Sequence, residues 1–290
     1  MRFILFVTSV LALLRRGLSR CTPMRVAPLL LLLLGTLQAH ADLEDIQKRG
    51  ALKVGVYEDF WPWADKNAGL DVDIAQALAQ HLGLRLEVMS FVAKDDMETD
   101  LRNMVTKGTY MGYGPADVMM HVPVDLRLMK EVPEAVIIAP YFHERIMYGY
   151  DTERLPDFVG PESLGTTFIG VVRSTISGVV LLDLDKGKYV SQIKIYDNAE
   201  ALMKALKTHE VAAVLATRAE IQAGISDDSR YQLLEANFPQ IPGKGWTVGL
   251  ALKAENKALD QAVQNAMEQM LSSGEIAALC KKRGITLIMP

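Results

Sequence analysis

Three large aromatic side chains lie in one polar loop early in the sequence. Phe60, Trp61 and Trp63 surround Pro62 within residues 58–69. Rings of this size are costly to leave in water, so we expect a ligand or another part of the protein to cover them. Loops at the carboxyl ends of strands are where α/β proteins hold ligands, and this loop follows a predicted strand. The chemistry predicted is desolvation of a bound molecule; the alternative is that the rings pack against their own domain.

Groupings typical of catalysis or metal binding are not visible in the sequence. There is no Ser–His–Asp grouping, no pair of catalytic carboxylates and no P-loop, and the five histidines show no metal-ligand spacing. A copper site is one interpretation of the nearby side chains of Met119, Met120, His121 and Met129. Met119 and Met120, however, lie on a predicted buried strand, which favours packing in the core. We therefore expect no enzymatic activity, no metal and no cofactor.

A strand, a loop and a helix position the aromatic loop. Residues 52–57 form a short apolar run typical of a buried strand, and 71–82 carry apolar residues at helical spacing, with Asp71 as the expected cap. A second strand at 84–92 and a helix at 96–107 follow. Two such units in succession predict parallel strands with helices on the faces of the sheet.

Further apolar runs predict the remaining elements. We expect strands at 117–120, 145–150, 167–172, 192–196, 211–216 and 246–253, and a helix at 198–206. Residues 110–115 read as an insertion, and their Gly-x-Gly is not a dinucleotide fingerprint because no helix opens after it.

The run Gly69-Leu70-Asp71-Val72-Asp73-Ile74-Ala75 resembles the G-F-D-V-D motif of bacterial periplasmic solute-binding proteins of family 3, the amino-acid receptors of ABC importers. Ala139-Pro140-Tyr141 is similar to the family's S-x-P-Y, and the order of elements is similar over nearly all of 48–286. The resemblance implies an α/β, type II periplasmic binding protein fold, with two α/β lobes joined by a two-strand hinge. It implies lobe 1 at 42–149 and 248–290, and lobe 2 at 150–247.

The resemblance also implies a ligand-binding face between the lobes. Arg127 falls near the arginine that grips a substrate carboxylate, Thr175 matches part of an anion-binding loop, and Thr217 stands where amino-acid receptors carry an ammonium-binding Asp. The missing Asp argues against ordinary α-amino acids. The expected ligand-binding residues are Asp59, Phe60, Trp63, Arg127, Arg173, Thr175 and Thr217.

Several of these residues also have a purely structural interpretation. Asp59 fits the cap of a turn, Arg127 fits an ion pair with Glu131 or Asp125 on a solvated helix, and Thr175 fits a plain helix N-cap.

Two functions fit this sequence. The first is capture of a small polar or anionic solute for an ABC importer, with Arg127 and Arg173 binding the anion. The second follows from residues 110–115 and from Asp117-Val118-Met119-Met120, which are similar to the J-type periplasmic proteins found with pyrroloquinoline-quinone alcohol dehydrogenases. Such a protein would be an accessory or chaperone partner of the dehydrogenase.

The first 41 residues are predicted to be a signal peptide with an N-terminal extension. Two apolar runs end at Ala39-His40-Ala41, which predicts cleavage after Ala41 and a periplasmic location, and Met24 is a candidate start. Both runs are shorter than the roughly 20 residues that span a bilayer, so we expect no stable membrane anchor after cleavage.

The charge and cysteine content of the remaining chain limit its partners. The leader holds five arginines and no acid, so the formal charge moves from −4 to −9 when it is removed. An acidic protein is a poor partner for nucleic acid. Cys280 is then the single cysteine, which excludes an internal disulfide, and we expect a monomer.

Overall fold

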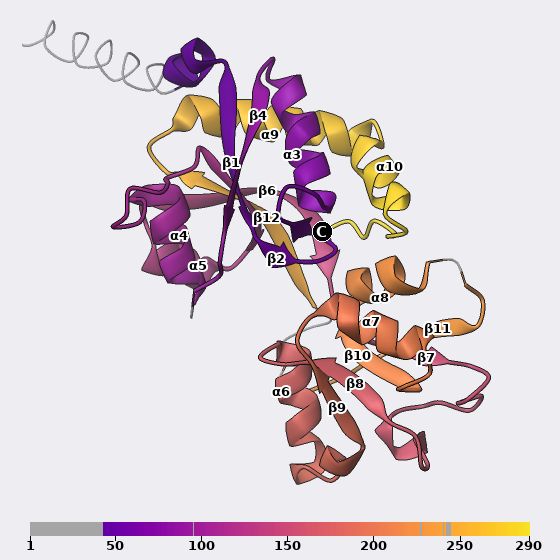
Figure 1. The fold of residues 1–290 in the computed structure, drawn as a ribbon. Helices are drawn as coiled ribbons and strands as arrows, with labels where there is room; N and C mark the ends of the chain where they lie inside the picture. Colours follow the sequence, from indigo (N-terminus) through magenta and orange to yellow (C-terminus); the bar gives the residue numbers. More distant parts are fainter. Residues whose placement is uncertain (1–42, 95, 227, 240, 242–244) are drawn as a thin grey trace, which may run out of the picture.

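The computed structural model describes residues 43–290 except 95, 227, 240 and 242–244, and in it the chain forms two α/β lobes (Figure 1). The predicted signal peptide, its cleavage site and the candidate start at Met24 lie outside the described residues. None of the described helices combines the length and the apolar character that a membrane crossing needs.

The first lobe is built on a five-stranded sheet in the order β4-β1-β5-β12-β6. β1 is parallel to β4 and β5, whereas β12 is antiparallel to β5 and β6. The strands are β1 (Ala51–Tyr57), β4 (Arg85–Phe91), β5 (Val118–Pro123), β6 (Ala135–Glu144) and β12 (Trp246–Lys253). A small hairpin of β2 (Asp59–Phe60) and β3 (Ala64–Asp65) extends from the end of β1.

Helices cover both faces of this sheet (Figure 1). One face packs against α3 (Leu70–His81), α9 (Lys257–Ser272) and α10 (Glu275–Lys282), preceded by a short helix at 43–49. The other packs against α4 (Met97–Leu101), which continues as the π-helical turn Arg102–Thr106, and against α5 (Leu126–Glu131). Burial on both faces explains why the strands read as continuous apolar runs.

The second lobe repeats the layered plan with a sheet in the order β11-β7-β10-β8-β9. Its strands are β7 (Ile146–Asp151), β8 (Ile169–Val172), β9 (Ile193–Tyr196), β10 (Ala213–Thr217) and β11 (Tyr231–Glu235). α6 (Ile176–Asp183) covers one face, and α7 (Ala199–Lys207) and α8 (Arg218–Ile225) cover the other. Short 3₁₀ turns occupy Pro161–Ser163, Leu184–Lys186 and Val190–Gln192.

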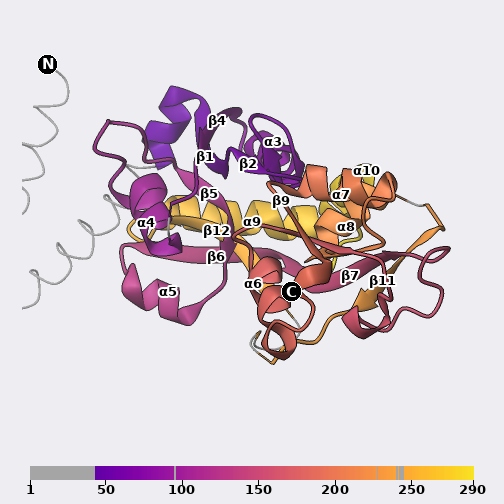
Figure 2. The ribbon, with the colours of Figure 1, turned by 60° about the horizontal axis from the view of Figure 1, so that its bottom comes forward.

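Two segments connect the sheets, as the resemblance implies. β6 ends at Glu144 and β7 begins at Ile146, and Figure 2 shows the two strands running end to end from one lobe into the other. The return enters the first sheet at β12, which begins at Trp246. The predicted boundaries at 149/150 and 247/248 therefore fall inside β7 and β12. Sheet membership changes at Arg145 and just before Trp246, and we place the lobe boundaries there.

The lobes also touch away from the connecting segments. Trp61 of the first lobe packs against the apolar cluster under α7 and α8. On the same helix pair, Gln222 exchanges two hydrogen bonds with Thr286 in the C-terminal tail, at 3.0 and 3.2 Å. The tail reaches the junction because Ile288 accepts a hydrogen bond from the His143 amide of β6. These contacts close one side of the junction and leave the other side for a cleft.

Candidate functional site

A cleft of about 930 Å³ lies between the two lobes. The first lobe supplies the ends of β1, β5 and β6 and the β2–β3 hairpin, and the second lobe supplies the starts of α6 and α8. Five carboxyl side chains line it, namely Glu58, Asp59, Asp65, Glu144 and Glu220. Four aromatic rings line it as well, from Tyr57, Phe60, Trp63 and Trp246.

The aromatic loop forms one wall of the cleft. Trp63 is only 1% exposed, and its ring lies 4.3 Å from that of His121 and 4.8 Å from that of Phe142. Phe60 meets His121 edge to face at 4.9 Å. The loop can turn this tightly because Gly69 adopts a φ of 130°, where a Cβ would overlap the carbonyl of Trp63. The three aromatics therefore divide: Phe60 and Trp63 line the cleft, whereas Trp61 packs against the other lobe.

Behind this wall lies a buried polar network. The Tyr141 hydroxyl donates to Asp71 Oδ1 at 2.6 Å, and His121 Nδ1 lies 3.2 Å from Asp71 Oδ2. Asp71 and Tyr141 are 2% and 0% exposed, and burial next to the Asp71 carboxylate raises the pKa of the Tyr141 hydroxyl. The network holds the His121 ring by Nδ1, which leaves Nε2 as the nitrogen available to the cleft that His121 lines.

The network corrects the predicted cap of α3. Gly69 is the N-cap and offers no side-chain hydrogen bond, whereas Asp71 lies inside the first turn with its carboxylate turned into the protein. Asp73, two residues further along α3, forms a 2.8 Å ion pair with Arg283 near the C-terminus. The buried hydroxyl and imidazole compete successfully for Asp71 because they would otherwise be left without partners.

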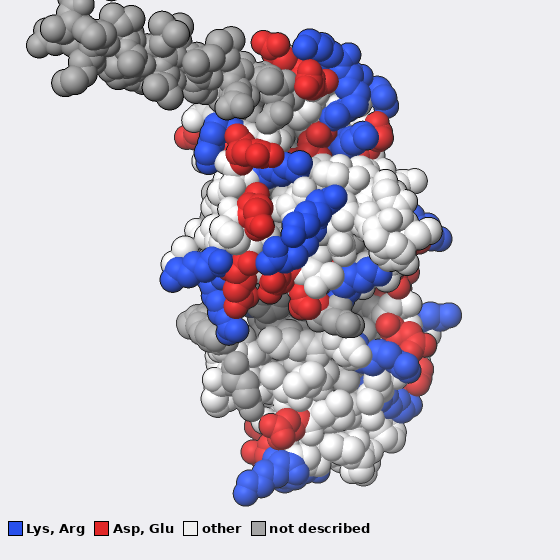
Figure 3. Space-filling model, turned by 90° about the vertical axis from the view of Figure 1, so that its left-hand side faces the viewer, with Lys and Arg blue, Asp and Glu red and all other residues white. Residues whose placement is uncertain are grey.

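Two carboxyl groups line the cleft at the lobe junction. Glu144, the last residue of β6, is 1% exposed, and Glu220 lies in the first turn of α8. Burial and the nearby Glu220 charge raise the pKa of Glu144 to about 8, and burial raises the pKa of Glu220. Acidic and basic side chains both border the waist between the lobes on the face shown in Figure 3.

The two predicted threonines both line the cleft, and both are helix N-caps. Thr175 accepts a hydrogen bond from the Gly178 amide at the start of α6. Thr217 and Glu220 form a capping box at the start of α8, in which Glu220 Oε2 accepts from the Thr217 amide at 2.8 Å. Each hydroxyl accepts a hydrogen bond from a backbone amide, so the main contribution of both threonines is to fix the helix starts that face the cleft.

Five of the seven predicted ligand-binding residues line the cleft: Asp59, Phe60, Trp63, Thr175 and Thr217. Arg127 and Arg173 do not. The Arg127 side chain is 84% exposed on α5 and pairs with Glu131 at 2.9 Å, as its structural interpretation expects. Arg173 is 64% exposed and pairs with Asp197 at 2.8 Å. The anion-binding role expected of both arginines therefore has no basis in the cleft, and binding by the other five stays a prediction.

Sequence reasoning missed His121, Glu144, Glu220 and Trp246 as cleft residues. The pattern Thr217-x-x-Glu220 was a readable sign, because it is the sequence form of a capping box. Glu144 gave no such sign, since it is one glutamate at the end of an apolar strand. Within the described residues, no group of three His, Cys, Asp or Glu side chains has the geometry to hold a metal ion.

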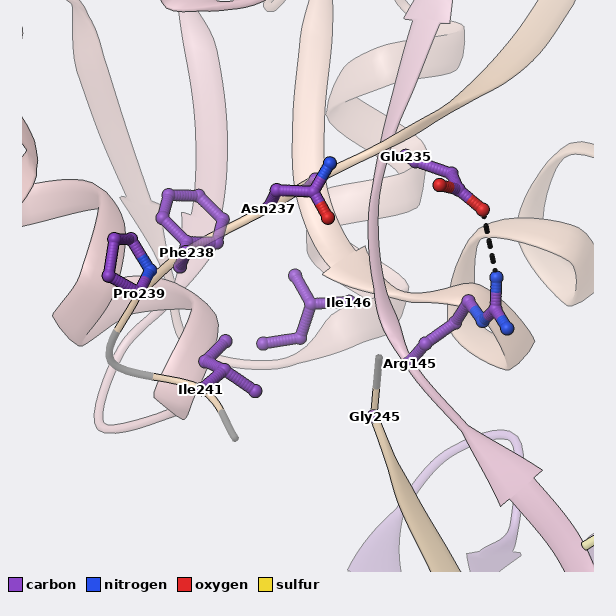
Figure 4. Close-up of a pocket in the computed structure, with 9 residues that line it drawn as sticks. Arg145, Ile146, Glu235, Asn237, Phe238, Pro239, Ile241 and Gly245 are labelled. Atoms are coloured by element: carbon purple, nitrogen blue, oxygen red, sulfur yellow. Dashed lines mark hydrogen bonds and ion pairs between the residues drawn. The ribbon is translucent and has the colours of Figure 1, made fainter. Parts of the chain in front are cut away.

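A second, smaller cavity of about 280 Å³ lies beside the connecting segment at Arg145 and Ile146 (Figure 4). Arg145 and Glu235 form a 3.0 Å ion pair beside it, and Ile146 and Phe238 contribute its apolar lining. Arg145 thus directs its guanidinium away from the larger cleft.

No protein-family model matches the chain, and no curated protein matches it. Solved structures do. An ancestral cationic amino acid solute-binding protein superposes with a TM-score of 0.64 at 20% identity, covering 83% of this chain and 99% of the other. An amino acid ABC transporter substrate-binding protein from Streptococcus pneumoniae, bound to L-arginine, gives 0.57 at 18% identity, covering 85% and 99%.

The solute receptors for L-cysteine of Neisseria gonorrhoeae give a TM-score of 0.54 at 17% identity, covering 83% of this chain and 92% of the other. At these identities the likeness concerns the fold. The chain has the type II periplasmic binding protein fold, in which two α/β lobes enclose a cleft.

Proposed function

We propose that the protein is a periplasmic solute-binding protein that captures a small organic cation in its interlobe cleft and delivers it to an ABC importer. The observation that carries this proposal is the composition of the cleft. Five carboxyl side chains line it, against one lysine, Lys66, among the described lining residues. A cation gains from both the carboxylates and the aromatic faces, whereas an anion would meet uncompensated negative charge.

The charge of the solute departs from the expectation drawn from the sequence. The sequence predicts a small polar or anionic solute, with Arg127 and Arg173 binding the anion, but neither arginine is among the residues that line the cleft. The cleft also offers no arginine to grip an α-carboxylate among its described lining residues. We therefore expect an amine or guanidine whose body packs on the partly exposed rings of Phe60 and Trp246, with a carboxylate adding little.

The descriptions of two similar structures support the choice of a cationic solute. They are described as a cationic amino acid solute-binding protein and as a protein bound to L-arginine. The expected periplasmic location, the ABC permease partner and the monomeric state remain predictions. The role needs no catalysis, so we also keep the prediction that the protein is not an enzyme.

The test is a calorimetric and thermal-shift screen of the chain from residue 42 with four probes: agmatine, L-arginine, citrulline and succinate. Agmatine keeps the guanidinium without a carboxylate, citrulline replaces the guanidinium by a neutral group, and succinate is an anion. We expect agmatine to bind at least as tightly as L-arginine and to raise the melting temperature by mass action. Tighter binding of succinate than of either cation would refute the proposal.

A second candidate is the accessory role beside a pyrroloquinoline-quinone alcohol dehydrogenase. The observation that favours it is the loop at 109–115, where Tyr110 is 98% exposed and Met111 is 77% exposed. Large apolar side chains this exposed are typical of docking surfaces. Co-purification of a quinoprotein dehydrogenase with the native chain, lost when both residues are changed to Ser, would support this role; probe binding without a dehydrogenase would favour the solute receptor.

A further inference from the structure

We infer that Glu144 and Glu220 together form the subsite that receives the cationic group of the solute, and that the cation enters in exchange for the proton held by the buried Glu144 carboxyl. The inference rests on the proposed cation-binding function. The two glutamates are where the positive charge of the solute would be recognised, and a proton would leave when the solute binds.

Glu144 lines the cleft, and one of its two carboxyl oxygens is buried without a hydrogen bond. Its Oε1 accepts the Arg145 amide at 3.0 Å, whereas its Oε2 accepts no hydrogen bond from any described residue. The Thr217 hydroxyl and the Ala219 amide lie near enough to favour the charged form, but neither gives the carboxyl a well-formed hydrogen bond. Because the side chain is 1% exposed, an ionised Oε2 is costly until a donor arrives.

Glu220 approaches from the opposite lobe. Its Oε2 accepts the Thr217 amide in the capping box, which fixes the carboxyl at the start of α8. No ion pair to Glu220 or to Glu144 forms within the described residues. The Glu220 charge is near enough to disfavour the ionised form of Glu144, because like charges repel each other.

Neighbouring cations do not neutralise the pair. Successive residues of an extended strand point to opposite faces, so Arg145 directs its guanidinium to Glu235, at 3.0 Å (Figure 4). Arg218, at the start of α8, lies near Glu144 and Arg145. It forms no ion pair with Glu144 or Glu220, and burial lowers the pKa of its guanidinium. From β5, His121 faces Glu220 across the cleft, with its Nδ1 engaged by Asp71.

The remaining partner for the unsatisfied charge is a proton or a bound cation. The Glu144 pKa of about 8 means that near neutral pH the pair keeps a proton before a cation binds. An ammonium or guanidinium donates to both carboxylates and favours their ionised forms, so it displaces that proton into solvent. The exchange conserves charge: one cation enters and one proton leaves. Since each lobe supplies one carboxylate, the bound cation also links the lobes.

Calorimetry of agmatine binding tests this exchange. Titrations of the wild-type chain at pH 7 in phosphate and in Tris, which have different ionisation enthalpies, give the number of protons released per agmatine bound. We expect a value close to one at pH 7 that falls to about one half at pH 8, where the Glu144 carboxyl is half ionised and agmatine is still fully protonated. The Glu144→Gln variant should release close to none and bind at least tenfold more weakly.

Glu58→Gln is the matched control, because it removes one carboxylate from the exposed rim of the same cleft. It should weaken binding by less than about threefold, as expected for a solvated charge, and leave proton release unchanged. Circular dichroism and thermal melting of Glu144→Gln check that the variant folds, and Glu220→Gln provides an independent second removal of charge.

The outcomes separate the inference from the proposed function. Agmatine binding without proton release, or unchanged binding by both Gln variants, would overturn the carboxyl-pair subsite and leave the cation receptor standing. Failure of the wild-type chain to bind agmatine or L-arginine would overturn both.

Discussion

Replacing Glu144 by Gln should make the protein more resistant to unfolding, and the gain should grow with pH. The buried carboxyl has a folded-state pKa raised from 4.5 to about 8. The folded protein therefore binds a proton more tightly than the unfolded chain does. Stability from this group is fully present below pH 4.5 and is lost as the pH rises through about 8.

The size of the effect follows from the shift. Each pKa unit corresponds to 1.36 kcal/mol, so a shift from 4.5 to about 8 gives a total loss of about 5 kcal/mol in the wild type. Because proton binding is linked to folding, the free energy of unfolding of the wild type should fall by about 1 kcal/mol by pH 5 and by about 3 kcal/mol by pH 7. By pH 9 it should have lost nearly the full amount. Gln cannot ionise, so Glu144→Gln should gain about 4 kcal/mol over the wild type between pH 5 and pH 9.

The assay is urea unfolding of both proteins, without ligand, at pH 5, 7 and 9. The free energy of unfolding comes from linear extrapolation, and an unchanged slope shows that both proteins unfold in the same way. The exposed Glu58→Gln variant should stay within about 0.5 kcal/mol of the wild type throughout. A difference between wild type and Glu144→Gln that stays constant with pH would refute the reasoning, because it would mean that Glu144 does not titrate differently on folding.

Three further changes test other parts of the site. Tyr141→Phe removes the hydroxyl that donates to buried Asp71 Oδ1, so urea unfolding should show a loss of about 1–3 kcal/mol; a loss below about 0.5 kcal/mol would contradict the buried network. Gly69→Ala forces a Cβ onto a loop carbonyl at positive φ, so the variant should lose more than about 2 kcal/mol and weaken agmatine binding; wild-type stability would show that the turn is not constrained. Arg127→Ala and Arg173→Ala should change the agmatine dissociation constant by less than about twofold in calorimetry. A large loss of affinity in either variant would show that this arginine does contribute to binding.

The sequence by itself determined the layered architecture. Alternation of apolar strands and amphipathic helices predicted β1, β4 and β12 to within one residue at each end, because burial on both faces of a sheet requires continuous apolar runs. The sequence predicted the secondary structure less well where tertiary contacts overrode the local preference of the chain. The helix expected at 96–107 becomes π-helical from Arg102, and β11 and α8 lacked a clear pattern and were not predicted.

The site depended on information that spacing along the chain does not carry. Arg127 and Arg173 were assigned by position, but only the fold shows that each helix or loop turns its arginine to solvent. Glu144 and Glu220 are 76 residues apart and belong to different lobes, so nothing local links them. The sequence determines which side chains are present; the tertiary structure decides which of them share a low-dielectric cleft, because proximity and burial arise when distant segments pack together.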